Sequence, residues 1–148
     1  SFPREKFHGQ SFLPALKGEK WHQKSVFASH TFHEITMYYP MRVMRGERYK
    51  LIYNMASGLE NPFASDLWES KTWQSVVHGN LKKLGAKDVN DFLHRPAFEL
   101  YDLESDPLET NNLADHPAYA EILKEMKAQI HQFQSDTRDP WVYKWKYE

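Results

Sequence analysis

The chain has 148 residues, enough for one domain with a buried core, and a formal net charge of −1, which provides no overall positive field for DNA, RNA or an anionic membrane. It contains no cysteine, so these residues hold no disulfide, thiolate metal site or thiol nucleophile. Aromatic residues make up 15% of the chain, which argues against disorder, and no apolar run is long enough for a membrane span, so we expect neither nucleic acid nor a membrane as a partner.

The first third of the chain is predicted to be a connector followed by strands. Residues 1–23 carry Pro and Gly at short intervals and are interpreted as the connector, while residues 24–148 form the folded unit. Residues 24–30 have strand character. Residues 41–44 and 49–54 are predicted to pair as a hairpin, because the four residues between them include the glycine that a tight reversal favours.

The remaining pattern completes an α+β fold. In chain order, the expected elements are a loop over 55–65, a helix capped by Asp66 and running through Trp68, Trp73, Val76 and Val77, a charged stretch over 79–91, a strand over 97–102 and a helix over 116–134. Asp115 or His116 is expected to cap the last helix, whose apolar face comprises Tyr119, Ile122, Leu123, Met126, Ile130 and Phe133. This order predicts a small antiparallel sheet of about four strands packed by the long C-terminal helix.

The C-terminal residues alternate rings with other side chains. Trp141, Tyr143, Trp145 and Tyr147 are each separated by one residue, and two of the intervening residues are lysines. This is strand periodicity. It fits an edge strand that packs its rings on the sheet, or a ring platform for a glycan.

No self-sufficient catalytic or metal site is complete in the sequence. His33 and Glu34 begin like a His-Glu-x-x-His zinc helix, but Met37 stands where the second histidine is required. His30 lies three residues before His33, among β-branched and aromatic residues that do not favour a helix. Dinucleotide, phosphate-loop, nucleophile-elbow and EF-hand patterns are absent. We therefore assign no catalytic residue and no metal ligand within these residues.

Three segments, in this order, resemble segments of the sulfatases. Residues 8–19 contain the pattern GxSxLPxLxGE, residues 39–52 resemble a hairpin of sulfatase C-terminal subdomains, and residues 99–114 read ELYDLxxDPxExxNLA. Residues 33–42 and 137–142 are most similar to the sulfamidases, which are heparan N-sulfatases or N-sulfoglucosamine sulfohydrolases. The resemblance covers nearly the whole chain but only the C-terminal third or so of such an enzyme.

The resemblance implies that this chain is the C-terminal subdomain, joined by its connector to an N-terminal catalytic domain that lies outside it. Sulfatases use calcium and a formylglycine made from a Cys/Ser-x-Pro-x-Arg motif in that domain. Residues 1–5 have the serine and the proline, but Glu5 stands where the arginine is required. We therefore expect this chain alone to be inactive and to carry no cofactor, with the parent hydrolysing N-sulfoglucosamine or a sugar sulfate ester of glycosaminoglycan type.

By the same resemblance, five residues are candidates for contacting the substrate: His33, Glu34, Arg42, Asp139 and Trp141. Glu34 and Arg42 could bind sugar groups, or could instead form a buried ion pair that organises the loop. An alternative function is a stand-alone carbohydrate-binding or interaction module without catalysis. The resemblance implies an exported parent (periplasmic, secreted or lysosomal) and is compatible with a homodimer.

Overall fold

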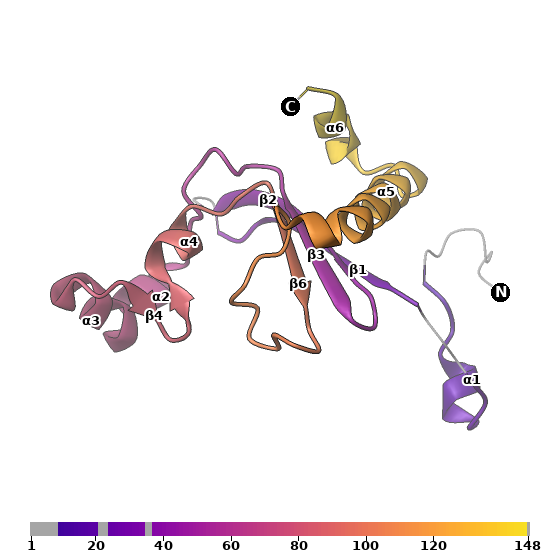
Figure 1. Ribbon diagram of the computed structural model, residues 1–148, viewed down its shortest axis with the longest axis horizontal. Helices are drawn as coiled ribbons and strands as arrows, with labels where there is room; N and C mark the ends of the chain where they lie inside the picture. Colours follow the sequence, from indigo (N-terminus) through magenta and orange to yellow (C-terminus); the bar gives the residue numbers. More distant parts are fainter. Residues whose placement is uncertain (1–8, 21–23, 35–36, 148) are drawn as a thin grey trace.

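The computed structural model describes residues 9–20, 24–34 and 37–147 and is built around a four-stranded antiparallel sheet (Figure 1). The strands lie in the order β1-β2-β3-β6 and comprise β1 (Val26–Phe32), β2 (Tyr38–Arg45), β3 (Tyr49–Asn54) and β6 (Phe98–Asp102). The expected hairpin is confirmed, as are the first strand and the strand near residue 100. Of the expected connector, residues 1–8 and 21–23 lie outside the described residues.

Strand β2 begins three residues earlier than expected and is irregular where it contains Pro40. His30 pairs with Met41 and Phe32 pairs with Tyr38, so two residues of β2 lie opposite the single residue Thr31. A proline has no N–H to donate to the neighbouring strand, and a bulge accommodates that loss. The bulge lies beside the turn that carries the predicted site residues His33 and Glu34.

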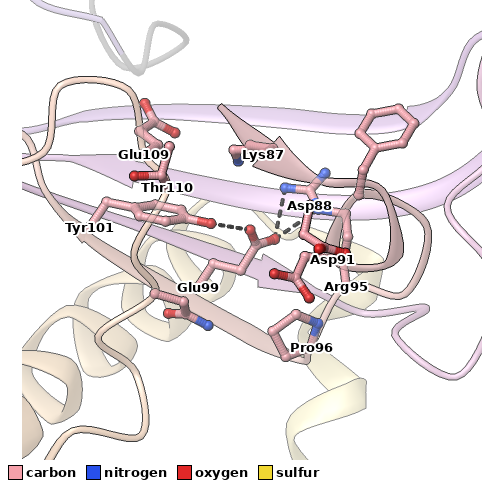
Figure 2. Close-up of a pocket in the computed structure, with 11 residues that line it drawn as sticks. Lys87, Asp88, Asp91, Arg95, Pro96, Glu99, Tyr101, Glu109 and Thr110 are labelled. Carbon is pink, nitrogen blue, oxygen red and sulfur yellow. Dashed lines mark hydrogen bonds and ion pairs between the residues drawn. The ribbon is translucent and has the colours of Figure 1, made fainter. Parts of the chain in front are cut away.

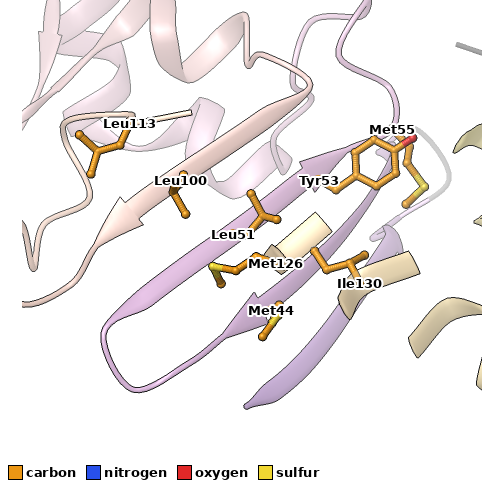
Figure 3. Packing of buried hydrophobic residues seen from close by; sticks show 8 residues of the cluster. All are labelled: Met44, Leu51, Tyr53, Met55, Leu100, Leu113, Met126 and Ile130. Atoms are coloured by element: carbon orange, nitrogen blue, oxygen red, sulfur yellow. The ribbon is translucent and has the colours of Figure 1, made fainter. Parts of the chain in front are cut away.

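One face of the sheet is covered by α5 (Ala120–Asp136), which follows the short helix η2 (Pro117–Tyr119) (Figure 1). His116, expected to cap the long helix, instead caps the short helix η2 before it by accepting a hydrogen bond from Ala118 N at 3.2 Å. The core between helix and sheet comprises Met44, Leu51, Tyr53, Met55, Leu100, Leu113, Met126 and Ile130 (Figure 3). The predicted apolar face of the helix is thus confirmed, with Met126 and Ile130 buried and Ile122 and Leu123 packed around them.

The segment between β3 and β6 forms several short elements at one side of the sheet (Figure 1). They are α2 (Ser65–Glu69), α3 (Lys71–Gly79), β4 (Lys83–Leu84), β5 (Lys87–Asp88) and α4 (Val89–Leu93). The single helix expected from Asp66 is wrong, because Ser70 adopts extended backbone between α2 and α3 and caps α3 by accepting a hydrogen bond from Trp73 N. A second ring cluster forms here around the buried Trp73, with contacts to Phe63 and Phe92.

The expected C-terminal strand is wrong. The rings lie on η3 (Pro140–Tyr143) and α6 (Lys144–Tyr147), two short helical turns that follow α5. Residues four apart share a face on a helix as they do on a strand. Both structures would therefore place Trp141 and Trp145 on the same side, and both rings do pack toward the core. Tyr143 and Tyr147, which strand geometry would place beside them, are exposed.

The N-terminal helix α1 (Leu13–Leu16) stands apart from the sheet (Figure 1). Its apolar side chains, with that of Phe12 before it, are largely exposed. In the described part of the chain, no helix has the length and apolar character needed to cross a bilayer.

Candidate functional site

The structure brings together Arg42 and Asp139, which are 97 residues apart in the sequence. Arg42 extends from β2 on the face that carries α5, and Asp139 follows the end of that helix. The guanidinium Nε and Nη2 donate to the two carboxylate oxygens at 2.5 and 2.9 Å, and Nη1 donates to the carbonyls of His30 and Met41. Both side chains are at least nine-tenths buried, so this is an internal ion pair in a fork geometry.

Asp139 has several partners besides Arg42. It accepts hydrogen bonds from Gln134 Nε2 and from the backbone N–H of Trp141, which makes it the cap of η3. Burial acts to raise the pKa of Asp139, but the hydrogen bonds from Arg42, Trp141 and Gln134 outweigh it and hold the pKa below its ordinary value. Asp139 is therefore an ionised side chain that joins β2, the end of α5 and the Trp141 ring.

The ring of Trp141 lines a groove beside this ion pair. Trp141 and Tyr38 have ring centroids 5.8 Å apart, and the groove between them and the loop after β3 has a volume of about 470 Å³. Ser57 and Lys144 also line it and supply polar groups. Two rings with a hydroxyl and an ammonium nearby form a surface that suits the C–H face and the substituents of a sugar.

The other two predicted residues, His33 and Glu34, are not joined to Arg42. Both are exposed in the turn after β1, where Glu34 has a φ of 61°. The ion pair that the structure shows for Arg42 joins it to Asp139, so the alternative of an Arg42–Glu34 pair is wrong. His30, considered beside His33 as a metal ligand, makes a hydrogen bond through Nδ1 to the carbonyl of Tyr39 at 3.1 Å.

A second polar site, which the sequence analysis did not anticipate, surrounds Glu99 on the opposite face of the sheet (Figure 2). Glu99 is an acidic residue on β6, yet it is only 4% exposed. It accepts hydrogen bonds from Tyr101 OH at 2.5 Å and Asn54 Nδ2 at 2.6 Å, and it pairs with Arg95 at 2.7 Å. A cavity of about 410 Å³ lies against this network, with walls from β5, α4, β6 and the loop that follows.

The network at Glu99 sets the charge state of its members. Burial acts to raise the pKa of Glu99, but the Arg95 charge and the hydrogen bonds from Tyr101 and Asn54 bring it below its ordinary value. Burial, together with the hydrogen bond to Glu99, raises the pKa of Tyr101. The sequence signal for this site was a carboxylate between the apolar residues Phe98 and Leu100 of a strand, with Arg95 four residues earlier.

The residues of this chain do not fit the two groups that the resemblance implies for the parent. Formylglycine requires a cysteine or serine in its motif; the chain has no cysteine, and residues 1–5 lie outside the described residues. Within the described ranges, no group of three or more His, Asp or Glu side chains could hold a metal ion. The acidic run over 102–109 instead makes internal contacts, with Asp102 bound to Arg48 and Glu109 bound to Lys50.

Comparison with known proteins shows which proteins the chain is similar to. No protein-family model matches it. It is 36% identical over 138 residues to human N-sulphoglucosamine sulphohydrolase. This match covers 90% of this chain but only 27% of the relative. It is 34% identical over 136 residues to an ulvan-active sulfatase of Formosa agariphila, covering 84% of this chain and 24% of the relative. A solved structure of a 2-O GAG sulfatase superposes on 95% of this chain and 22% of its own, with a TM-score of 0.62 and 25% identity.

The two kinds of comparison agree with the motifs. Relatives and structures alike are sulfatases, and the chain spans about a quarter of the length of the curated relatives that it matches (27% and 24%). This coverage is consistent with the C-terminal subdomain that residues 8–19, 39–52 and 99–114 predict. The chain is therefore similar to sulfatases over most of its length, and it corresponds to only part of theirs.

Proposed function

We propose that this chain is the C-terminal subdomain of a sulfatase-type hydrolase that removes sulfate from N-sulfoglucosamine or from a sugar sulfate ester. The observation that carries the proposal is the 36% identity to N-sulphoglucosamine sulphohydrolase, which extends over 90% of the chain. The catalytic domain of the parent would supply the formylglycine and the calcium ion. This segment would complete the fold and line the outer part of the substrate cleft.

Within that role, the groove at Trp141 is the proposed contact with the sugar. The Trp141 and Tyr38 rings offer apolar faces, and the Ser57 hydroxyl in the same groove can hydrogen-bond a sugar substituent. Arg42 and Asp139 act as positioning residues, because each is engaged by the other and Asp139 caps the turn that carries Trp141. His33 and Glu34, exposed in the turn after β1, are proposed to face the sugar directly.

The proposed docking surface for the catalytic domain is the β1–β2 part of the sheet face that α5 does not cover. Register places Val26, Ala28 and Val43 on the face opposite Met44. Val26 is 54% exposed, and Ala28 and Val43 are exposed or half-buried. Neighbouring apolar side chains left open to water in this way are stabilised when a second layer of structure covers them.

A chimera tests the proposal. The segment of human N-sulphoglucosamine sulphohydrolase that aligns with this chain is replaced by the chain, and turnover of N-sulfoglucosamine is measured. We expect the chimera to be active, and Trp141→Ala in the chimera to raise KM for an oligosaccharide substrate about tenfold, on the scale of one ring contact. The matched control is Trp68→Ala, which removes another partly exposed tryptophan, on α2, and should leave KM unchanged.

The isolated chain separates this proposal from its alternative. As a dependent subdomain it should neither turn over N-sulfoglucosamine nor bind heparan fragments tightly. Micromolar binding that Trp141→Ala abolishes would favour a stand-alone carbohydrate-binding module, since the Trp141–Tyr38 groove would then suffice by itself. Turnover by the isolated chain would contradict both functions.

A further inference from the structure

The cavity beside Glu99 is large enough for a small ligand and has polar walls (Figure 2). Its volume of about 410 Å³ is within the range of small-molecule sites, and three neighbouring segments, residues 87–96, 99–101 and 109–112, enclose it. Lys87, Asp88, Asp91 and Arg95 line it, and Tyr101 lies across the Glu99 carboxylate from Arg95. It lies on the other face of the sheet from the Arg42–Asp139 pair, so no residue of the Trp141 groove contributes to it.

Some of the carboxylates around the cavity have cationic partners and others do not. The two most enclosed carboxylates have cations of their own, since Glu99 pairs with Arg95 and Glu109 pairs with Lys50 at 2.7 Å. Among the described residues the Asp91 side chain has neither a hydrogen bond nor an ion pair, although Asp91 lines the cavity. Nearby, Asp88 uses one oxygen to cap α4 through Asn90 N, which leaves its other oxygen available.

Donors for a ligand are fewer than acceptors. Lys87 holds its ammonium 5.2 Å from the centroid of the Tyr101 ring, and most of the Arg95 guanidinium faces Glu99. Counting the paired Lys50 with the lining residues, three cations oppose four carboxylates. An anionic ligand would meet a net negative wall, whereas a ligand rich in N–H and O–H groups would satisfy Asp88 and Asp91.

Part of the cavity wall is apolar. Phe92 and Pro96 line it together with the Tyr101 ring, and these apolar groups give a ligand surfaces for its C–H groups. A divalent cation fits this site poorly, because no three metal-ligating side chains in the described part of the chain converge. We propose that the cavity binds a hydroxylated amine of monosaccharide size, such as an amino sugar with an unsubstituted amine, held by Asp91 and Asp88.

The test titrates the full chain with glucosamine, N-acetylglucosamine and glucose, and follows backbone amide shifts by NMR. We expect glucosamine to shift the amides of residues 87–101, with N-acetylglucosamine and glucose binding about tenfold more weakly because they lack the ammonium group. Asp91→Asn should weaken glucosamine binding by a similar factor. Because Asp91 is exposed in the first turn of α4, this change should leave the fold intact, which circular dichroism can verify.

The matched control is Asp66→Asn, since Asp66 occupies the first turn of another five-residue helix, far from the cavity in sequence. It should leave glucosamine binding unchanged. The proposal is overturned if glucosamine shifts no amide of residues 87–101, if Asp91→Asn binds as tightly as the unmodified chain, or if N-acetylglucosamine binds as well as glucosamine. The result is independent of the proposed hydrolase role, because no turnover is measured and Trp141→Ala should not affect it.

Discussion

Replacing Asp139 with asparagine tests whether the buried ion pair holds the C-terminal turns on the sheet. Asparagine has nearly the same shape and can still cap η3, but it leaves the Arg42 guanidinium without a compensating charge. The Arg42 and Asp139 side chains are only 8% and 10% exposed. Breaking a buried pair by removing one charge costs about 3–5 kcal/mol, and the retained amide oxygen places this substitution near 3 kcal/mol. That is a large part of the roughly 5–15 kcal/mol that stabilises a typical domain.

Urea unfolding followed by tryptophan fluorescence measures this loss. With an m-value of about 2 kcal/mol/M, a loss of 3 kcal/mol lowers the midpoint by about 1.5 M. Trp141 and Trp145 both report on the region, since Trp145 Nε1 donates to Gln134, which in turn donates to Asp139. A change of less than about 0.5 M, which is what an exposed pair would produce, would refute the assignment of a strong internal pair.

Two controls separate the charge from the packing. Arg42→Met combined with Asp139→Leu removes both charges, and this variant should recover much of the stability that Asp139→Asn loses, because no buried charge remains unpaired. The second control is pH. The pKa of Asp139 is lowered in the folded state, so its contribution is present above the unfolded value of about 3.9 and is lost as pH falls through the folded pKa. The stability difference between the unmodified chain and Asp139→Asn should therefore shrink below about pH 4.

Three further changes probe other parts of the fold. Ile130→Ala, at a side chain 1% exposed in the core, should cost about 2–5 kcal/mol in urea unfolding, whereas Leu108→Ala, at a residue 69% exposed, should change stability by less than about 0.5 kcal/mol. Asn80 ends α3 with a φ of 47°, so Asn80→Ala should lower thermal stability by about 1 kcal/mol and Asn80→Gly should not. Glu99→Gln should make stability less sensitive to acid, because the pKa of Glu99 is lowered in the fold, and an unchanged acid unfolding profile would contradict that role.

Local pattern was sufficient for the elements whose burial repeats along the chain. The β2–β3 hairpin and α5 were both predicted, because alternation and helical spacing record which side chains meet the core. The same local evidence failed at the C-terminus. Trp141 and Trp145 are four residues apart, and both a strand and a helix place residues at that spacing on one side. The spacing therefore could not distinguish a strand from a helix, and the outcome depended on tertiary packing such as that of Trp145 against Tyr53 and Phe98.

The motifs that relate the chain to sulfatases were also visible in the sequence, and so were the individual residues Arg42, Asp139 and Trp141. Their arrangement was not. Arg42 and Asp139 are 97 residues apart, and a charge carries no local signal of which distant charge will lie beside it. Asp139 reaches Arg42 because α5 crosses the sheet and ends beside β2.

The Glu99 cavity was decided by tertiary structure in the same way. The sequence by itself determined the class of fold, the apolar faces and the resemblance to sulfatases, because these depend on residue types at short and regular spacing. The pairing of Glu99 with Arg95, Tyr101 and Asn54, and the lack of any partner for Asp91 among the described residues, depend on how β3, β6 and α4 come together. Burial makes such polar groups costly unless they are paired, so their partners are chosen by the folded arrangement of the chain and not by its local pattern.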